Sequence, residues 1–394
     1  MKTICEHKSH IEQKKKARSK QSVRITVQQT TLITALSHAA RGVEARTTMP
    51  ILSGLLWEVE THAMRFTATN DDYTIVHRLP IDGETIRVTA SGRVVLPAKL
   101  TTDLVRRLPQ VPLEVTVDAQ NVVHFSAGAL EYTVHGMEAE DFPRLPTLPL
   151  TTMWHVSGRR LAALFRHVLF AVAVDQTRPI LKGVELVAEE RRLVATATDS
   201  HRLAQSELEL VGEATDGKLV VPGKSVQEVI GLFEAREEPV ELALGDKVLV
   251  MQDDRFTVYF RLLSGAYPDT RMLIPREAKT SVTFERLRLI DALERAFVIA
   301  QHNRNQTVRL TVGETVELFT VHPELGKYNE TIAVRARQGD DLVIWFNARY
   351  LLDALKYIDA EAVAIGANGA LSPFVVRPEG ATVPTHLIVP VKTG

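Results

Sequence analysis

The sequence feature that most constrains the fold is an internal repeat that occurs three times, at a spacing of roughly 125 residues. Two copies of one motif occupy Arg46–Gly54 and Gln176–Gly183, and both contain Pro-Ile-Leu before the final glycine. A third, more diverged copy lies in Asn303–Val312. Each copy runs into an alternating apolar pattern, which is typical of a strand with one buried face. The chain is therefore expected to fold as three similar domains in tandem.

Helical patterns recur with the same spacing. Each repeat begins with a predicted helix, and a second predicted helix follows a strand and a short turn. Asn347 is the predicted N-cap of the last helix. Many short strands with turn residues surround these helices, so the fold class is α+β. The six predicted helices are Thr31–Ala40, Leu100–Leu108, Gly158–Val172, Ser225–Phe233, Arg286–Ala300 and Ala348–Ile358.

Proline-marked segments, Pro146–Leu150 and Pro275–Lys279, separate the repeats. We therefore predict domains at 22–147, 148–277 and 278–394, after a basic extension at 1–21. The extension has seven lysines or arginines and two glutamates. It is expected to be disordered. An arm for nucleic acid, an over-long start or an expression remnant all remain open as its origin.

Composition excludes several classes of protein. Hydrophobic residues make up 45% and charged residues 24% of the 394 residues, a balance typical of soluble globular domains. The longest apolar run, Leu161–Val174, is interrupted by Arg166 and His167, so no membrane association is expected. The single cysteine, Cys5, excludes an internal disulfide framework and a cysteine-based zinc site. These features favour a cytoplasmic protein.

Two motifs suggest chemistry but have the wrong spacing for it. Asp199-Ser200-His201 contains the residue types of a hydrolase triad, yet neighbouring residues of a strand point to opposite faces. The segment before Lys224 resembles a phosphate-binding loop, but Lys218 stands where that loop needs glycine. The histidines form no pair with zinc-ligand spacing. We therefore expect no catalytic residues, metal or cofactor. A hydrolase or nucleotide-binding enzyme that uses Ser200, His201 or Lys224 is the alternative.

Several motifs, in order along three repeats, resemble bacterial DNA polymerase III β subunits, the sliding clamps. The resemblance covers about residues 23–394. The variant forms of the motifs, including Ser200, are similar to those of the Gram-positive branch of this family. Met272, the Lys392–Gly394 tail and the basic extension depart from the family pattern, so an accessory paralogue stays open. The matching motifs are Arg178–Gly183, Ala197–Ala204, Leu262–Asp269, Phe346–Leu355 and His386–Val391.

The resemblance implies three DNA-clamp domains in each chain and a head-to-tail homodimer that closes a six-domain ring. Such a ring is a non-catalytic processivity factor that encircles double-stranded DNA without sequence specificity. The implied protein partners are the DNA polymerase III α subunit, the clamp loader, and other replication and repair proteins with clamp-binding peptides. A monomeric adaptor that keeps the peptide site but forms no ring is the other alternative.

The resemblance also implies three sets of site residues. Contacts with DNA phosphates are expected from basic residues on the inner helices and their loops: Arg41, Arg46, Arg107, Arg178, Lys224, Arg304 and Arg349. A pocket for a partner peptide is expected between the second and third domains, formed by Leu181, Thr198, Ser200, His201, Arg202, Leu203, Pro268, Leu273, Leu371, Pro373, Leu387, Val389, Pro390 and Val391. The dimer interface is expected at Tyr132 and Val134 of one chain and Val298 and Ile299 of the other.

We predict that deleting residues 1–21 leaves the Tm of the protein unchanged, because this segment has too few apolar residues to pack against a core. Differential scanning calorimetry of the full and shortened chains measures the effect. A clearly lower Tm after deletion would show that the extension contributes to the fold.

Overall fold

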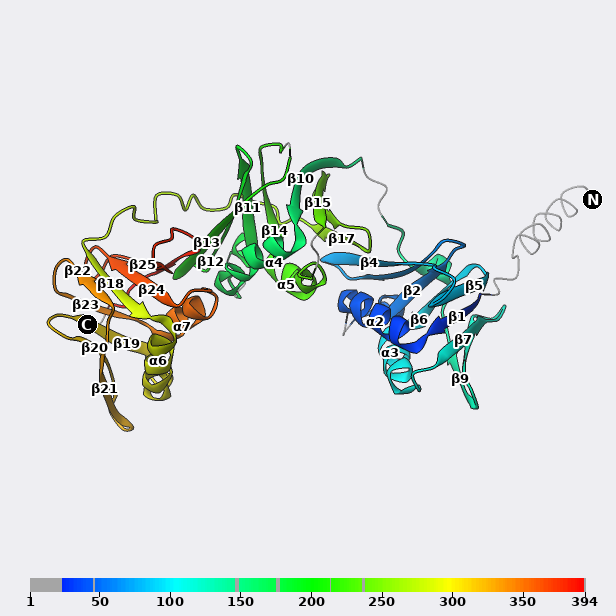
Figure 1. Ribbon diagram of the computed structural model, residues 1–394, viewed down its shortest axis with the longest axis horizontal. Coiled ribbons are helices and arrows are strands. Elements are labelled where there is room, and N and C mark those ends of the chain that lie inside the picture. Colours follow the sequence, from blue (N-terminus) through cyan, green and yellow to red (C-terminus); the bar gives the residue numbers. More distant parts are fainter. Residues whose placement is uncertain are drawn as a thin grey trace, which may run out of the picture. The chain divides into compact units, whose positions relative to one another are not determined.

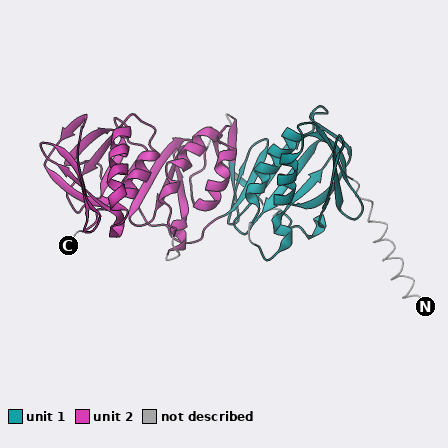
Figure 2. Cartoon of the chain, turned by 90° about the horizontal axis from the view of Figure 1, so that it is seen from below, with its two compact units in different colours: residues 1–151, 242–261 teal, residues 152–241, 262–394 magenta. Residues whose placement is uncertain are grey.

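The computed structural model describes residues 23–44, 47–145, 149–174, 178–212, 214–235 and 238–392. Within these ranges the chain folds into two compact units (Figure 2). Unit 1 contains the first repeat together with Leu242–Arg261, and unit 2 contains Thr152–Glu241 and Leu262–Gly394. No helix within the described ranges is long and apolar enough to cross a membrane.

The described residues of the first repeat form two α-helices and nine strands, which Figure 1 labels in part. The helices are α2 (Gln29–Ala39) and α3 (Ala98–Arg107). The strands are β1 (Arg24–Gln28), β2 (Gly54–Val59), β3 (Ala63–Thr69), β4 (Tyr73–Pro80), β5 (Ile86–Ala90), β6 (Gly92–Pro97), β7 (Pro112–Val117), β8 (Val122–Ala127) and β9 (Leu130–His135).

The second repeat follows the same order. Its helices are α4 (Gly158–Arg166) and α5 (Gly223–Val229). Its strands are β10 (Thr151–Ser157), β11 (Gly183–Glu189), β12 (Arg192–Thr198), β13 (Arg202–Glu209), β14 (Gly217–Pro222), β15 (Pro239–Gly245), β16 (Val248–Gln252) and β17 (Phe256–Arg261).

The third repeat contains α6 (Arg286–Ala300) and α7 (Ala348–Lys356). The side chain of Asn347 accepts hydrogen bonds from the backbone N–H groups of Arg349 and Tyr350, which confirms the predicted N-cap. The strands are β18 (Thr280–Glu285), β19 (Thr307–Val312), β20 (Val316–His322), β21 (Gly326–Ile332), β22 (Ala336–Gln338), β23 (Leu342–Asn347), β24 (Ala362–Ala367), β25 (Phe374–Pro378) and β26 (Thr385–Ile388).

Two of the three aligned sequence motifs fold alike. Short 3-10 helices precede a strand at η2 (Pro50–Ser53) and η5 (Pro179–Lys182), whereas η7 (Arg304–Gln306), in the diverged copy, contains Asn305 with a left-handed φ of 64°. Gly54 and Gly183 end two of these turns in tight places. A Cβ on Gly54 would lie 2.5 Å from Val95 Cγ1, and one on Gly183 would lie 2.4 Å from Val220 Cγ1. Gly54 and Gly183 therefore have matching surroundings, which confirms that the first two copies of the sequence repeat are also a structural repeat.

Strands of one repeat continue the sheet of the repeat before it. In unit 1, β17 pairs antiparallel with β4, so the sheet runs β16-β17-β4-β3-β2-β6. In unit 2, β26 pairs antiparallel with β13 in a sheet of order β14-β11-β12-β13-β26-β25-β24-β18-β22. The predicted domain limits therefore follow the repeats of the sequence, whereas the compact units share strands across those repeats.

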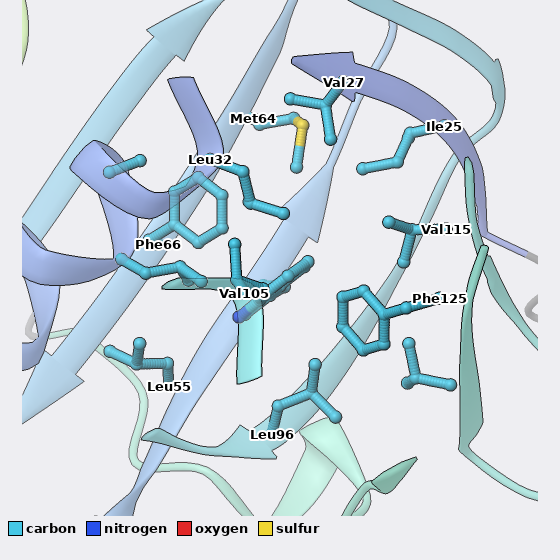
Figure 3. Close-up of a cluster of buried hydrophobic side chains, with 14 of the residues drawn as sticks. Ile25, Val27, Leu32, Leu55, Met64, Phe66, Leu96, Val105, Val115 and Phe125 are labelled. Carbon is cyan, nitrogen blue, oxygen red and sulfur yellow. The ribbon is translucent and has the colours of Figure 1, made fainter. Parts of the chain in front are cut away.

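Apolar faces of helices and sheets form the cores. In unit 1, Leu32 of α2 and Val105 of α3 lie with Phe66 and Phe125 in one buried cluster (Figure 3). A similar cluster in the third repeat joins α6 and α7 to β19 and β23. Burial of this apolar surface is the main favourable term in folding.

Candidate partner-peptide and DNA-contact sites

The pairing of β13 with β26 brings the predicted pocket residues of the second and third repeats together. Leu203 lies opposite Leu387 in this pairing. Both are buried with Val375, and Ile274 packs against them. The two repeats therefore share a small apolar core at this junction, within unit 2.

A second buried cluster adjoins the end of β12. It contains Leu181 and Tyr267 together with Ala173 and Val220. The Thr198 backbone N–H donates a hydrogen bond of 3.1 Å to the Tyr267 hydroxyl. Burial raises the pKa of Tyr267, so this hydroxyl stays protonated. These contacts hold the segment around Pro268 against the sheet.

The turn between β12 and β13 is fixed by the Asp199 carboxylate. It accepts hydrogen bonds of 2.9 Å from the backbone N–H groups of both His201 and Arg202. Ser200, between them, has a left-handed backbone with φ of 77°. Because the carboxylate binds the backbone and Arg202, the turn is structural and lacks the relay of a hydrolase triad.

Arg202 is the best-anchored charge of this region. Its Nε lies 2.9 Å from Asp199 Oδ2, and its Nη1 lies 2.8 Å from Asp353 Oδ2. The guanidinium carbon lies 4.7 Å from the ring centroid of Tyr350 and 5.3 Å from that of Phe170. Two carboxylates and two aromatic rings thus hold one cation, 12% exposed, in a fixed position.

An aromatic group extends this arrangement inward. Phe170 stacks on Tyr357 with ring centroids 5.2 Å apart, and it contacts His386 edge-on at 5.0 Å. Burial lowers the pKa of His386 to about 3, so its imidazole is neutral at neutral pH. Its Nε2 lies 3.2 Å from the His167 carbonyl oxygen, to which the neutral ring donates.

The predicted pocket residues divide into a buried base and an exposed surface. Leu181, Thr198, Leu203 and Leu387 are buried. The remaining residues are partly or fully exposed: Ser200, His201, Arg202, Pro268, Leu273, Leu371, Pro373, Val389, Pro390 and Val391. The apolar members of this surface are the ones available to a ligand.

The tail is tied to this surface through its backbone. The Val389 N–H donates to the His201 carbonyl at 2.9 Å, and the Val391 N–H donates to the Trp345 carbonyl at 2.7 Å. Leu371 is 68% exposed and Leu273 is 53% exposed. Met272, the neighbour of Leu273 in the chain, is 90% exposed. Exposed apolar side chains of this size are suited to bind an apolar peptide side chain.

Sequence reasoning missed four residues that organise this region: Phe170, Asp353, Tyr357 and His386. Asp353 lies within the matching motif Phe346–Leu355, and His386 begins the motif at the tail. These motifs could be recognised in the sequence, but the stacking of Phe170 on Tyr357 and the pairing of Asp353 with Arg202 depend on contacts between distant parts of the chain.

Six of the seven predicted DNA-contact residues lie in the described part of the chain, and Arg46 lies outside it. All six are exposed. Arg41 and Arg107 belong to unit 1, where they lie at or just beyond the last turns of α2 and α3. The other four belong to unit 2: Arg178, Lys224, Arg304 and Arg349.

Two of these residues have distinct surroundings. Arg349 Nε lies 3.1 Å from Asp353 Oδ1, so the same carboxylate also neutralises Arg202. Lys224 lies in the first turn of α5, and β14 ends directly before this helix. A strand that passes straight into a helix leaves no loop to surround a phosphate.

Within the described ranges, no group of three His, Cys, Asp or Glu side chains is arranged to hold a metal ion.

The predicted dimer residues lie on one edge strand, β9, and on one helix, α6. In unit 1, β9 is the last strand of the sheet β5-β1-β7-β8-β9. Tyr132 on this strand is exposed, whereas the Val134 side chain is buried in the core of unit 1. In unit 2, β21 is the last strand of a four-stranded sheet. Val298 on α6 is 63% exposed, and Ile299 is partly buried.

Sequence models for three domains of the DNA polymerase III beta subunit match the chain in order. The N-terminal domain matches residues 23–146, the central domain matches 155–269, and the C-terminal domain matches 271–392. The beta sliding clamp of Halalkalibacterium halodurans is 33% identical over 91% of this chain and 96% of its own length. That of Bacillus subtilis is 31% identical over 94% of this chain and all of its own length.

Solved structures agree with these matches. The DNA polymerase sliding clamp of Bacillus subtilis superposes with a TM-score of 0.90 at 31% identity. The sliding clamp of Pseudomonas aeruginosa, solved with griselimycin bound, superposes with a TM-score of 0.89 at 26% identity. Each comparison covers 94% of this chain and all of the other.

We predict that Asp353→Asn lowers the free energy of unfolding of unit 2 by about 1–3 kcal/mol, because largely buried Arg202 loses one of its two counter-charges. Urea unfolding followed by circular dichroism measures the change. Glu361→Gln is the matched control, since the exposed Glu361 pairs with Arg335 at the surface, where ion pairs contribute little. Equal effects of the two substitutions would contradict the role of Asp353.

Proposed function

Because this chain belongs to the DNA polymerase III beta subunit family, we propose that it closes as a head-to-tail homodimer around double-stranded DNA. It is a sliding clamp, a processivity factor without an active site of its own, built from three DNA-clamp domains. The observation that carries this function is the match of all three repeats, in order, over nearly the whole chain. We place this role in the cytoplasm.

Ring closure needs two complementary surfaces on each chain. The exposed edge of β9 in unit 1 and the exposed edge of β21 in unit 2 both present unpaired backbone groups. Pairing β9 of one chain with β21 of the other satisfies both edges at once. Tyr132 then faces Val298 and Ile299 of α6 in the partner, while Val134 contributes only its backbone. A head-to-tail contact of this kind is repeated once to close the ring.

Sliding requires contacts that hold DNA without fixing its register. Arginine and lysine side chains bind phosphates, which are the same at every base pair. The exposed Arg41, Arg107, Arg178, Lys224 and Arg304 fit this role, and Arg46 is proposed with them from its place in the repeat. Arg349 contributes less than the others as long as Asp353 neutralises it.

The exposed surface around Val389, Leu371 and Leu273 is the proposed docking site for clamp-binding peptides. We propose that these peptides belong to the DNA polymerase III α subunit, the clamp loader and other replication and repair proteins. Apolar side chains at the centre with Arg202 and His201 at the rim suit a short peptide with apolar anchors. The monomeric adaptor, the second candidate, would use this surface alone.

We predict that light scattering of the purified protein gives twice the chain mass of 43.8 kDa and that this mass persists on dilution. Tyr132→Asp with Val298→Asp is expected to shift the mass to that of one chain, because the charges would be buried unpaired at the proposed interface. A single-chain mass for the unaltered protein would contradict ring closure and favour the adaptor.

We predict that Leu371→Asp with Val389→Asp weakens binding of a polymerase-derived peptide by about a hundredfold, since two apolar contacts are replaced by charges. Fluorescence anisotropy of the labelled peptide measures the affinity. These two positions are chosen because both are exposed, whereas aspartate at the buried Leu181 would disturb folding. Retention of the dimer mass is the control, and unchanged affinity would show that the peptide binds elsewhere.

A further inference from the structure

A surface cavity in unit 1 has no part in the functions proposed above. Its volume is about 330 Å³, within the range of small ligand sites. Its lining includes the apolar Leu56 and Phe142, the hydroxyl-bearing Thr67, and the cations Arg65, Arg93 and Arg144. Leu56, Ala139 and Phe142 belong to one buried cluster and form its apolar floor.

The corresponding place in the second repeat has a different lining. Leu56 pairs with Thr67 in the same register in which Glu185 pairs with Thr196. The position on the cavity floor is thus occupied by the apolar Leu56 in unit 1. Its counterpart in unit 2, Glu185, is charged and lies 2.7 Å from Lys218. The two repeats share the backbone here but have different chemistry.

The hydroxyl of Thr67 gives the second observation. Thr67 is 1% exposed, and its Oγ1 has no hydrogen-bond partner within the described ranges. Its counterpart, Thr196, accepts a hydrogen bond of 3.2 Å from Gln205. A buried hydroxyl without a partner is costly, and such groups occur where a ligand or water completes the bonding.

Among the described residues, one cation at the rim remains available to an anion. Arg65 is shared by Glu60 and by Glu58, which lies 3.6 Å away, and Arg93 lies 2.9 Å from Glu140, so these two arginines are already neutralised. Arg144 is exposed and forms no ion pair with any residue in the described ranges. Its counterpart in the second repeat is the acidic Asp269, which is bound by Arg271.

We propose that this cavity binds a second partner peptide, one in which an apolar side chain stands next to a carboxylate. The apolar group covers Leu56 and Phe142, and the carboxylate binds Arg144. The chain's own residues 1–21 do not suit the site, because their seven basic residues would face a rim with an unpaired arginine. The inference rests on unit 1 alone and stands whether or not the ring closes.

The test uses the full chain with Leu371→Asp and Val389→Asp, so that the docking surface of unit 2 is disabled. The probe is a fluorescein-labelled octapeptide with a leucine pair flanked by aspartates, and its charge-reversed partner has lysines in their place. Fluorescence anisotropy is expected to show binding of the aspartate peptide and at least tenfold weaker binding of the lysine peptide. Absence of binding, or equal binding of both peptides, would overturn the proposal.

Three added substitutions test the contacts. Arg144→Glu is expected to weaken the aspartate peptide by about tenfold or more. Arg87→Glu on β5 makes the same charge change at an exposed residue outside the cavity, and it should leave the affinity unchanged. Thr67→Val keeps the side-chain shape and is expected to weaken binding severalfold while the Tm is retained. Equal effects of Arg144→Glu and Arg87→Glu would overturn the site, and unchanged affinity in Thr67→Val would overturn the hydroxyl contact.

Discussion

Antiparallel strand pairing between successive repeats is the interaction on which both units depend. In unit 2, β13 and β26 come from different repeats, yet their pairing buries Leu203 against Leu387 and places the Asp199–Arg202 turn beside the tail. In unit 1, β4 and β17 are joined in the same way. Backbone hydrogen bonds and apolar burial act together here, because each pairing also covers an edge that would otherwise be open.

The same arrangement explains where function can diverge between repeats. Corresponding strands keep their register, so a substitution changes the chemistry of a surface without moving it. The floor position occupied by Leu56 in unit 1 is occupied by Glu185 in unit 2, and the rim position of Arg144 corresponds to Asp269. The first two repeats also share a turn in which one side chain accepts hydrogen bonds from the backbone. Asn70 accepts them from the N–H groups of Asp72 and Tyr73, as Asp199 does from those of His201 and Arg202.

Much of the fold was predictable because it depends on local patterns. Helical periodicity located the six α-helices of the described ranges, although α4 and α5 end earlier than predicted, and Asn347 was recognisable as an N-cap. The candidate site was predictable only where residues lie within a matching motif. The packing of Leu203 against Leu387 and the pairing of Asp353 with Arg202 join residues more than a hundred positions apart, and the pairing of Asp353 with Arg349 joins adjoining helical turns. Periodicity alone does not determine which face of a strand is covered by a later repeat.

The sharing of strands has a consequence for how such a chain is divided. Cutting at the proline-marked limits would remove β16 and β17 from the sheet of unit 1 and leave β4, which carries Ile75 and Val76, as an open edge. A single repeat is therefore not a self-sufficient building block. Exchange of modules between related chains should transfer β16 and β17 together with the first repeat, so that β4 keeps its neighbour strand.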